Sequence, residues 1–191
     1  LWREYPRLLL SATMQASDPI DPRHVDRATV RSLAPLLQDP DPRHGANAVA
    51  LIEEARPALS VPALAGALAS APPGRRPELV AALERCLDRS TSSVPADAAT
   101  LSAVESVLAD GDGLSDLERA QLVHLYGRLV APERATGTLE EARNDGARAV
   151  RLAASAALGE EDLDDRLVRA VRSDAPAERA TARRVLRACL L

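Results

Sequence analysis

The side chains that could carry metal or acid–base chemistry are few and widely separated in this chain of 191 residues. The three histidines, His24, His44 and His124, have no second histidine, cysteine or acid at the spacing that a metal site needs. His24 and His44 each follow Asp-Pro-Arg, where we expect solvated side chains at the start of a helix. His124 lies in an apolar stretch and is expected to be half-buried with its hydrogen bonds satisfied. The sequence therefore predicts no metal site and no cofactor.

Acidic residues gather at three places, but none of these has the features of a catalytic pair. Two carboxylates doing acid–base work need one of them in a dry pocket, which separates their pKa values. The clusters stand at expected helix ends or beside arginines, and they are Glu53-Glu54, Glu140-Glu141 and the run 160–165. Asp162 with Arg166, and Asp165 with Arg169, have the i,i+4 spacing of ion pairs on exposed helices. Phosphate loops, nucleophile elbows, CxxC pairs and dinucleotide fingerprints are also absent from the sequence, so we expect no enzyme.

The last expected helix carries a row of arginines, which is a more distinctive feature than the histidines and acidic clusters. Arg179, Arg183 and Arg187 recur every four residues and share one side of a helix, and Arg184 lies further round. We call these four residues the arginine strip. They have no acid four residues earlier, so the strip could grip a phosphate or an acidic peptide. The alternative is a solvated face, or arginine stems that cover the end of the core.

The composition predicts closely packed helices. Ala and Leu dominate an apolar fraction of 46%, whereas aromatic residues make up 2% and Phe is absent. A net charge of −4 gives no general attraction to nucleic acid or to an anionic membrane. The two cysteines, Cys86 and Cys189, are too few for a disulfide framework and are expected as buried thiols. Because no run approaches the ~18 apolar residues that cross a bilayer, we expect a cytoplasmic protein without a membrane span.

Turn-forming clusters recur along the chain, and their first residues are 33, 38, 34 and 29 positions apart. The clusters are Asp39-Pro40-Asp41-Pro42, Pro72-Pro73-Gly74, Asp110-Gly111-Asp112-Gly113, Asn144-Asp145-Gly146 and Ser173-Asp174-Ala175-Pro176. Pro and Gly end helices, and Asp caps the helix that follows. A period of this length with two helices per unit is typical of a helical solenoid.

The apolar spacing between these turns predicts a lead helix near 2–15 and five antiparallel helix pairs. The pairs are 22–38 with 43–56, 61–70 with 76–89, 97–109 with 115–130, 134–143 with 147–158, and 162–173 with 177–190. Pro62 and Pro77 are expected in first turns, where the missing N–H is not needed, and Pro35 is expected to break its helix. We expect one domain over 1–191. Because its first residue is Leu, we also expect it to be a piece of a longer protein.

Three segments resemble HEAT repeats. Residues 61–68 (VPALAGAL) resemble the opening of a first helix, and residues 36–42 (LLQDPDP) resemble the turn inside a repeat. Residues 150–159 (VRLAASAALG) resemble a second helix. The resemblance covers about 22–190 and implies an all-α, right-handed solenoid of about five helix pairs.

HEAT repeats also carry a ladder between successive repeats, formed by a turn Asp and an Arg six residues later in the second helix. Asp145 and Arg151 match this spacing, so the resemblance implies that they belong to such a ladder. The first pair departs from the pattern, because the residue six positions after Asp39 is Gly45.

The resemblance implies a protein–protein interaction scaffold that binds through its concave face. Trp2, Tyr5 and the arginine strip are the candidate contacts. One alternative is binding of nucleic-acid phosphates through the arginine strip. Another is a HEAT-like enzyme such as a bilin lyase or a DNA glycosylase, but the His-Glu dipeptides of the related hydroxylases are absent and the one Trp lies outside the array.

Overall fold

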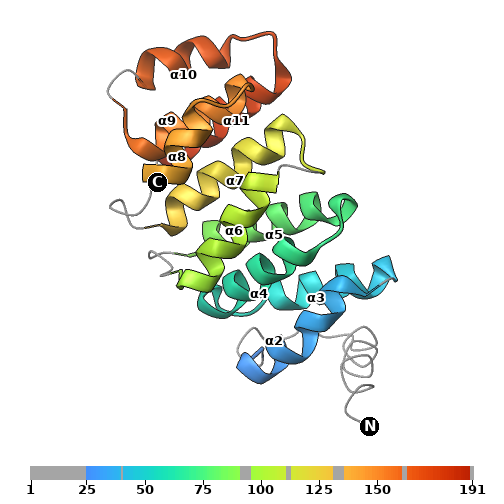
Figure 1. The fold of residues 1–191 in the computed structure, drawn as a ribbon. Helices are drawn as coiled ribbons and strands as arrows, with labels where there is room; N and C mark the ends of the chain where they lie inside the picture. The colour runs from blue at the N-terminus through green and yellow to red at the C-terminus, as the bar shows by residue number, and fades with distance from the viewer. Residues whose placement is uncertain are drawn as a thin grey trace. The chain divides into compact units, whose positions relative to one another are not determined.

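A computed structural model describes residues 25–39, 41–90, 96–110, 113–130, 136–160 and 163–189. Within these ranges the protein is entirely helical, as the composition predicts (Figure 1). The chain divides into two compact units inside one helix, between Ala103 and Val104, and each unit is described by itself. The expected lead helix near 2–15, with Trp2 and Tyr5, falls outside the described residues.

The described residues of the first unit form six helical segments and part of a seventh. They are α2 (Arg27–Leu33), the 3₁₀ helix η2 (Ala34–Gln38), α3 (Pro42–Glu53), α4 (Pro57–Ser70), the 3₁₀ helix η3 (Pro73–Arg75), α5 (Arg76–Asp88) and the first residues of α6 (Ala98–Asp110). Two aspartates begin helices here, namely Asp41, as the turn chemistry predicts, and Asp26, which lies inside the helix expected over 22–38. Asp26 accepts a hydrogen bond from Thr29 N at 2.8 Å, and Asp41 accepts one from Arg43 N at 2.9 Å.

The prolines of this unit explain where its helices begin and change. Pro35 lies where α2 gives way to η2, and Pro77 occupies the first turn of α5, both as expected. The expectation for Pro62 was wrong. Because Pro57 takes the first-turn position, α4 starts four residues earlier and Pro62 falls inside it. There Pro62 cannot donate to the carbonyl of Ala58, so one helical hydrogen bond is missing.

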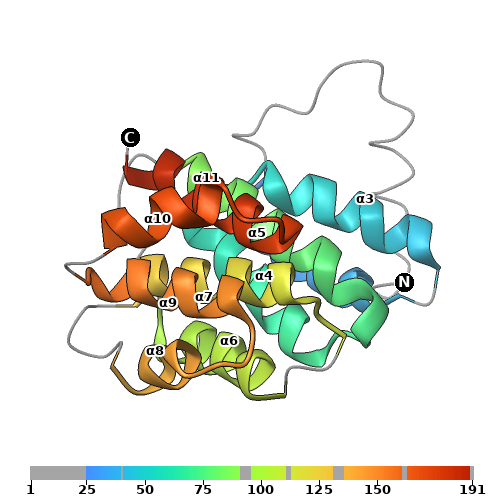
Figure 2. The same ribbon diagram turned by 90° about the horizontal axis from the view of Figure 1, so that it is seen from above.

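The core of the first unit lies between α4 and α5, with α3 and η2 packed against them (Figure 2). Leu64 and Leu68 of α4 and Leu83 of α5 are fully buried. At the ends of α3 and α5, Arg85 Nε donates to the Glu53 carboxylate at 3.1 Å. The Glu53 carboxylate is therefore the counterion of an arginine at a helix end, as expected, but its side chain is only 14% exposed and not fully solvated.

In the second unit, the described ranges form the end of α6 and five further helices. They are α7 (Asp116–Leu129), α8 (Thr136–Arg143), α9 (Arg148–Leu158), α10 (Leu163–Val171) and α11 (Pro176–Cys189). Helix α7 begins with a capping box, in which Ser115 Oγ accepts from Glu118 N and the Glu118 carboxylate accepts from Ser115 N. Helix α9 ends at Gly159, whose φ of 68° favours glycine.

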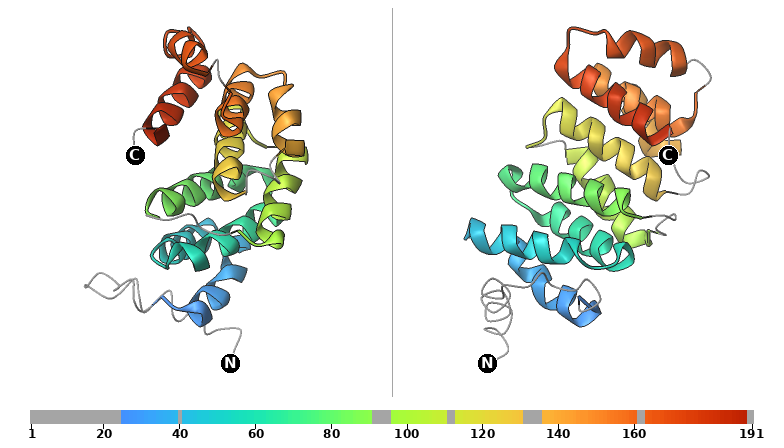
Figure 3. Two further views of the ribbon diagram at one scale, coloured as in Figure 1. Left: turned by 90° about the vertical axis from the view of Figure 1, so that its left-hand side faces the viewer. Right: turned by 180° about the vertical axis from the view of Figure 1, so that it is seen from behind.

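Within the second unit α7 packs beside α9 and α9 packs beside α11, while α8 packs on α9 and α10 on α11 (Figure 3). The approach of α7 to α9 is close, because a Cβ placed on Gly127 would lie 2.5 Å from Ala157 Cβ. Leu152 of α9, Leu167 of α10 and Val185 of α11 share one apolar cluster. This cluster fixes α9, α10 and α11 around a common core.

Tyr126 is the largest fully buried side chain of the described core. Its hydroxyl donates to Glu105 Oε1 at 2.6 Å, which joins α7 to α6 inside the second unit. Burial, together with the hydrogen bond to Glu105, raises the pKa of the Tyr126 phenol above its ordinary value.

Candidate functional site

The turn between α8 and α9 positions two arginines through Asp145. Asp145 Oδ1 accepts a hydrogen bond from Ala147 N at 2.7 Å, which orders the turn just before α9. The same carboxylate binds Arg119 of α7, with Nη1–Oδ2 at 2.7 Å and Nη2–Oδ1 at 3.2 Å. Arg151 instead donates from Nη1 to the backbone carbonyls of Asp145 and Gly146, at 2.7 and 2.8 Å. Asp145 and Arg151 therefore meet through the backbone, and the carboxylate of Asp145 pairs with Arg119.

The guanidinium of Arg119 is the positive partner of the Asp145 and Asp116 carboxylates. Burial lowers the pKa of its guanidinium, but the hydrogen bond to Asp116 and the interaction with Asp145 outweigh burial, so the pKa is raised. Arg151 has no carboxylate within ion-pair distance in the part of the chain that the structure describes. Its guanidinium is held in place by the turn but is not neutralised there.

The turn before α11 repeats this arrangement with Ser173 in the place of Asp145. Ser173 Oγ accepts from Ala175 N at 3.2 Å, and Arg179 Nη1 donates to the Ser173 carbonyl at 2.7 Å. Arg179, the first member of the arginine strip, is therefore bonded to the turn. Arg183 is exposed and Arg184 is half-buried, whereas the side chain of Arg187 lies outside the described residues. The strip is thus not a uniform row of solvated cations.

In the turn before α3, the arginine that donates to the turn carbonyl comes from a later segment of the chain. Asp39 accepts from Asp41 N at 2.9 Å, but the position six residues later is Gly45. Arg75 reaches into the space beside Gly45 and donates from Nη1 to the Asp39 carbonyl at 3.2 Å. A Cβ on Gly45 would lie 1.7 Å from Arg75 Nη2, so the arginine fills the space of the missing side chain.

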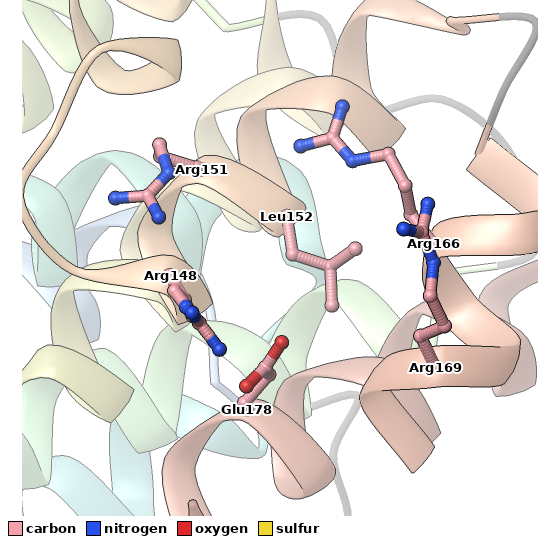
Figure 4. Close-up of a pocket in the computed structure, with 6 residues that line it drawn as sticks. All are labelled: Arg148, Arg151, Leu152, Arg166, Arg169 and Glu178. Atoms are coloured by element: carbon pink, nitrogen blue, oxygen red, sulfur yellow. The ribbon is translucent and has the colours of Figure 1, made fainter. Parts of the chain in front are cut away.

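Four arginines line an open groove of about 460 Å³ in the second unit (Figure 4). Arg148 and Arg151 come from α9, and Arg166 and Arg169 come from α10. Leu152 and Glu178 complete the lining. These four arginines were not among the candidates expected from the sequence, and they come from helices that precede the arginine strip.

The arginines of the groove differ in how their charge is compensated. Arg166 Nη1 contacts Glu160 Oε2 at 2.6 Å and is paired. Arg169 donates from Nε to the backbone carbonyl of Asp165 at 3.2 Å, so the ion pair expected between their side chains is not formed. Because the backbone takes this donor, the carboxylate of Asp165 does not neutralise Arg169. Arg148 is exposed and likewise has no ionic partner among the described residues.

Among the residues that the structure describes, Glu178 is the one carboxylate that lines the groove. Its Oε2 accepts a hydrogen bond from Ser173 Oγ at 2.6 Å, which anchors it at the start of α11. Three guanidinium groups without carboxylate partners therefore face one carboxylate, so the groove carries a positive charge in a chain whose net charge is −4. Such a site favours an anion with several oxygen acceptors, because guanidinium groups bind these through paired hydrogen bonds.

A signal for this groove is present in the sequence as two similar tetrapeptides. They are Arg148-Ala-Val-Arg151 and Arg166-Leu-Val-Arg169. An i,i+3 spacing places both arginines of each tetrapeptide on one side of its helix. The acids four residues before Arg166 and Arg169 concealed the signal, because the expected pairing would have neutralised both arginines.

The remaining candidates from the sequence gain no partners for metal chemistry. His44 Nδ1 lies 3.5 Å from Asp39 Oδ2, and His124 is buried in α7. No group of three or more histidine, cysteine or acidic side chains gathers at a potential metal site anywhere in the described ranges. Over the same residues, no helix has the length and apolarity needed to cross a membrane.

Comparisons of the chain with family models, with curated proteins and with solved structures find no match. The groove formed by α9, α10 and α11 is therefore the main structural indication of function.

Proposed function

We propose that this protein is a non-enzymatic binding module, a right-handed HEAT-like α-solenoid that acts as a scaffold for a partner protein. In this proposal, the groove lined by Arg148, Arg151, Arg166 and Arg169 holds an acidic segment of that partner. The observation that carries the proposal is the excess of guanidinium charge in the groove. The packing of α7, α9 and α11 side by side, with α8 and α10 against them, supports a stack of helix pairs.

The lining of the groove suits a polar, anionic ligand. Leu152 is the one apolar side chain among the six lining residues, so an apolar ligand would find little to bury against. Arg151 and Arg169 each donate to a backbone carbonyl, which restricts their side chains before a ligand arrives. Restricted side chains lose less conformational entropy on binding, so they contribute more to affinity.

The chemistry of the groove supports binding rather than catalysis. Its polar groups are four guanidinium groups and the Glu178 carboxylate, which is hydrogen-bonded to Ser173. Nucleophilic catalysis requires a nucleophile with an adjacent base, and the lining supplies no such pair. The buried thiol of Cys86 is consistent with a reducing compartment, so we place the proposed scaffold in the cytoplasm.

Fluorescence anisotropy with a labelled acidic peptide tests the proposal. We compare the wild-type chain with the variant Arg148→Glu/Arg151→Glu/Arg169→Glu, which reverses the unpaired charges of the groove. The matched control is Arg31→Glu/Arg172→Glu/Arg183→Glu, which changes the net charge equally at exposed positions outside the groove. We expect the groove variant to bind at least about tenfold more weakly and the control to bind within about twofold of wild type.

Two results would overturn the proposal. One is an acidic peptide that binds no better than its Gln/Asn counterpart. The other is an equal loss in both variants, because that would show a response to net charge alone.

A further inference from the structure

We infer that the preferred ligand of the groove is a phosphate monoester, carried on a phosphorylated segment of the partner protein. This inference rests on the proposed function and specifies its ligand. It follows from the charge of the groove, from the donors on its two sides and from the small extent of the site, which holds one phosphate and not a row of them.

The charge of the groove matches a dianion. Arg148, Arg151 and Arg169 have no carboxylate within ion-pair distance among the described residues, and Arg166 is paired with Glu160. Subtracting the Glu178 carboxylate leaves about two positive charges. A phosphate monoester carries about −1.5 to −2 near neutral pH, whereas a carboxylate side chain carries one negative charge. A single aspartate or glutamate of a partner would therefore leave the groove with an excess of positive charge.

The donors approach from two helices. Arg148 and Arg151 belong to α9, and Arg169 belongs to α10, so a ligand between them meets guanidinium groups from more than one direction (Figure 4). A phosphate monoester offers three terminal oxygens in a tetrahedral arrangement, so it can accept from both helices together. A carboxylate offers two oxygens in one plane, which suits a single guanidinium fork.

The contacts of Arg151 and Arg169 leave donors for such a ligand. Arg151 uses Nη1 on the two turn carbonyls, and its Nε and Nη2 have no partner within the described ranges. Arg169 uses Nε on the Asp165 carbonyl, and its two terminal nitrogens are likewise without a partner there. Each guanidinium is therefore anchored by one edge and keeps further N–H groups for an oxyanion.

A nucleic-acid backbone fits the groove less well than a phosphorylated peptide. Nucleic-acid binding commonly uses about six to ten phosphate contacts spread along a surface, whereas this site is one local groove in a chain of net charge −4. Each phosphodiester carries a single charge, and Glu178 would repel the neighbouring phosphates of a polynucleotide. A peptide places one dianion in the groove without bringing further phosphates beside Glu178.

The test uses three peptides of one sequence that differ at a single position, which is phosphoserine, glutamate or serine. Binding to the full chain is measured by isothermal titration calorimetry, with a single-stranded and a duplex oligonucleotide as further ligands. We expect the phosphoserine peptide to bind at least about tenfold more tightly than the glutamate peptide, and the serine peptide to bind most weakly. We also expect inorganic phosphate to compete with the phosphoserine peptide.

The variants Arg148→Gln and Arg169→Gln remove one charge each from exposed side chains that have no ionic partner, so both are expected to fold. Each should weaken binding of the phosphoserine peptide about tenfold, whereas Arg172→Gln should leave it unchanged. Arg169→Lys keeps the charge but loses the planar fork, so it should recover only part of the affinity. Circular dichroism of every variant provides the folding control.

Equal binding of the phosphoserine and glutamate peptides would overturn this inference and leave the proposed function intact. Absence of binding by both peptides would overturn the proposed function as well. Tighter binding of either oligonucleotide than of the phosphoserine peptide, with the same sensitivity to Arg148→Gln, would also overturn the inference and would assign the groove to nucleic acid.

Discussion

Arg119 of α7 binds the carboxylate of Asp145 through both terminal nitrogens, at 2.7 and 3.2 Å, across 26 positions of sequence. Asp145 also accepts a hydrogen bond from Ala147 N, in the turn that leads into α9. One carboxylate thus orders the turn before α9 and attaches that turn to α7. Because α9 carries Arg148 and Arg151, this pair also supports one side of the groove.

We predict that the pair contributes measurably to the stability of the second unit. The variants are Arg119→Met, Asp145→Asn and the double variant, of which Asp145→Asn retains a side-chain oxygen that can accept from Ala147 N. The two side chains are 25% and 20% exposed, so their attraction is only partly screened by solvent. We expect a coupling free energy of about 1 kcal/mol in urea unfolding, and additive single effects would contradict it.

The close approach of α7 and α9 predicts an unusual cost for a small substitution. In Gly127→Ala the added Cβ would lie 2.5 Å from Ala157 Cβ, so the two helices must move apart. We expect a loss of about 1–3 kcal/mol in the free energy of unfolding, although alanine favours a helix.

Gly66→Ala is the matched control, because no atom outside the adjoining backbone of α4 lies within 4 Å of its added Cβ. It should raise the free energy of unfolding by about 0.5–1 kcal/mol. Equal stability of the two variants would show that α7 and α9 do not approach as described.

Tyr126 should ionise at higher pH than an exposed tyrosine. Its pKa is raised in the folded state, so the stabilisation is present below the unfolded pKa and is lost as pH rises through the folded pKa. Absorbance titration of Tyr5→Phe, which leaves Tyr126 as the one tyrosine, should give a midpoint above that of the unfolded chain. Tyr126→Phe should cost about 1–2 kcal/mol at neutral pH, because Glu105 loses its donor.

Asp26 should have the opposite behaviour in acid. Hydrogen bonds from Thr29 N and Thr29 Oγ1, at 2.8 and 2.9 Å, lower the pKa of its carboxyl. Its stabilisation is therefore present above the unfolded pKa and is lost as pH falls through the lowered folded pKa. An NMR titration of the Asp26 carboxyl should show this low midpoint, and Asp26→Asn should keep the cap while removing the titration.

The positions of the helices could be predicted because apolar periodicity and turn chemistry act locally. Asp41 and Ser115 begin helices for reasons visible within three residues of each. The start of α4 was predicted less accurately, because Pro57 and Pro62 both suit the first turn of a helix. Pro57 occupies the first turn, whereas the prediction assigned that position to Pro62.

The groove could not be predicted by the same local rules. The i,i+4 rule predicts ion pairs only between side chains of the same helix. Arg169 binds a backbone carbonyl instead, and its charge remains for the groove. Arg151 and Arg169 line one groove because of how α9 and α10 are packed, and spacing along a single helix does not contain that information.

The donor that Arg75 supplies to the Asp39 carbonyl bears on how this chain could be recombined. Helices α9 and α11 each bring their own arginine to the turn that precedes them, through Arg151 and Arg179. In the turn before α3, the corresponding donor is Arg75, which lies in the segment that follows α4. A hybrid protein that takes α2 to α3 without Arg75 would leave that carbonyl unsatisfied, unless Gly45→Arg restored a donor within α3. The helical segments of this protein are therefore not interchangeable, and the positions at which they could be separated differ between its two units.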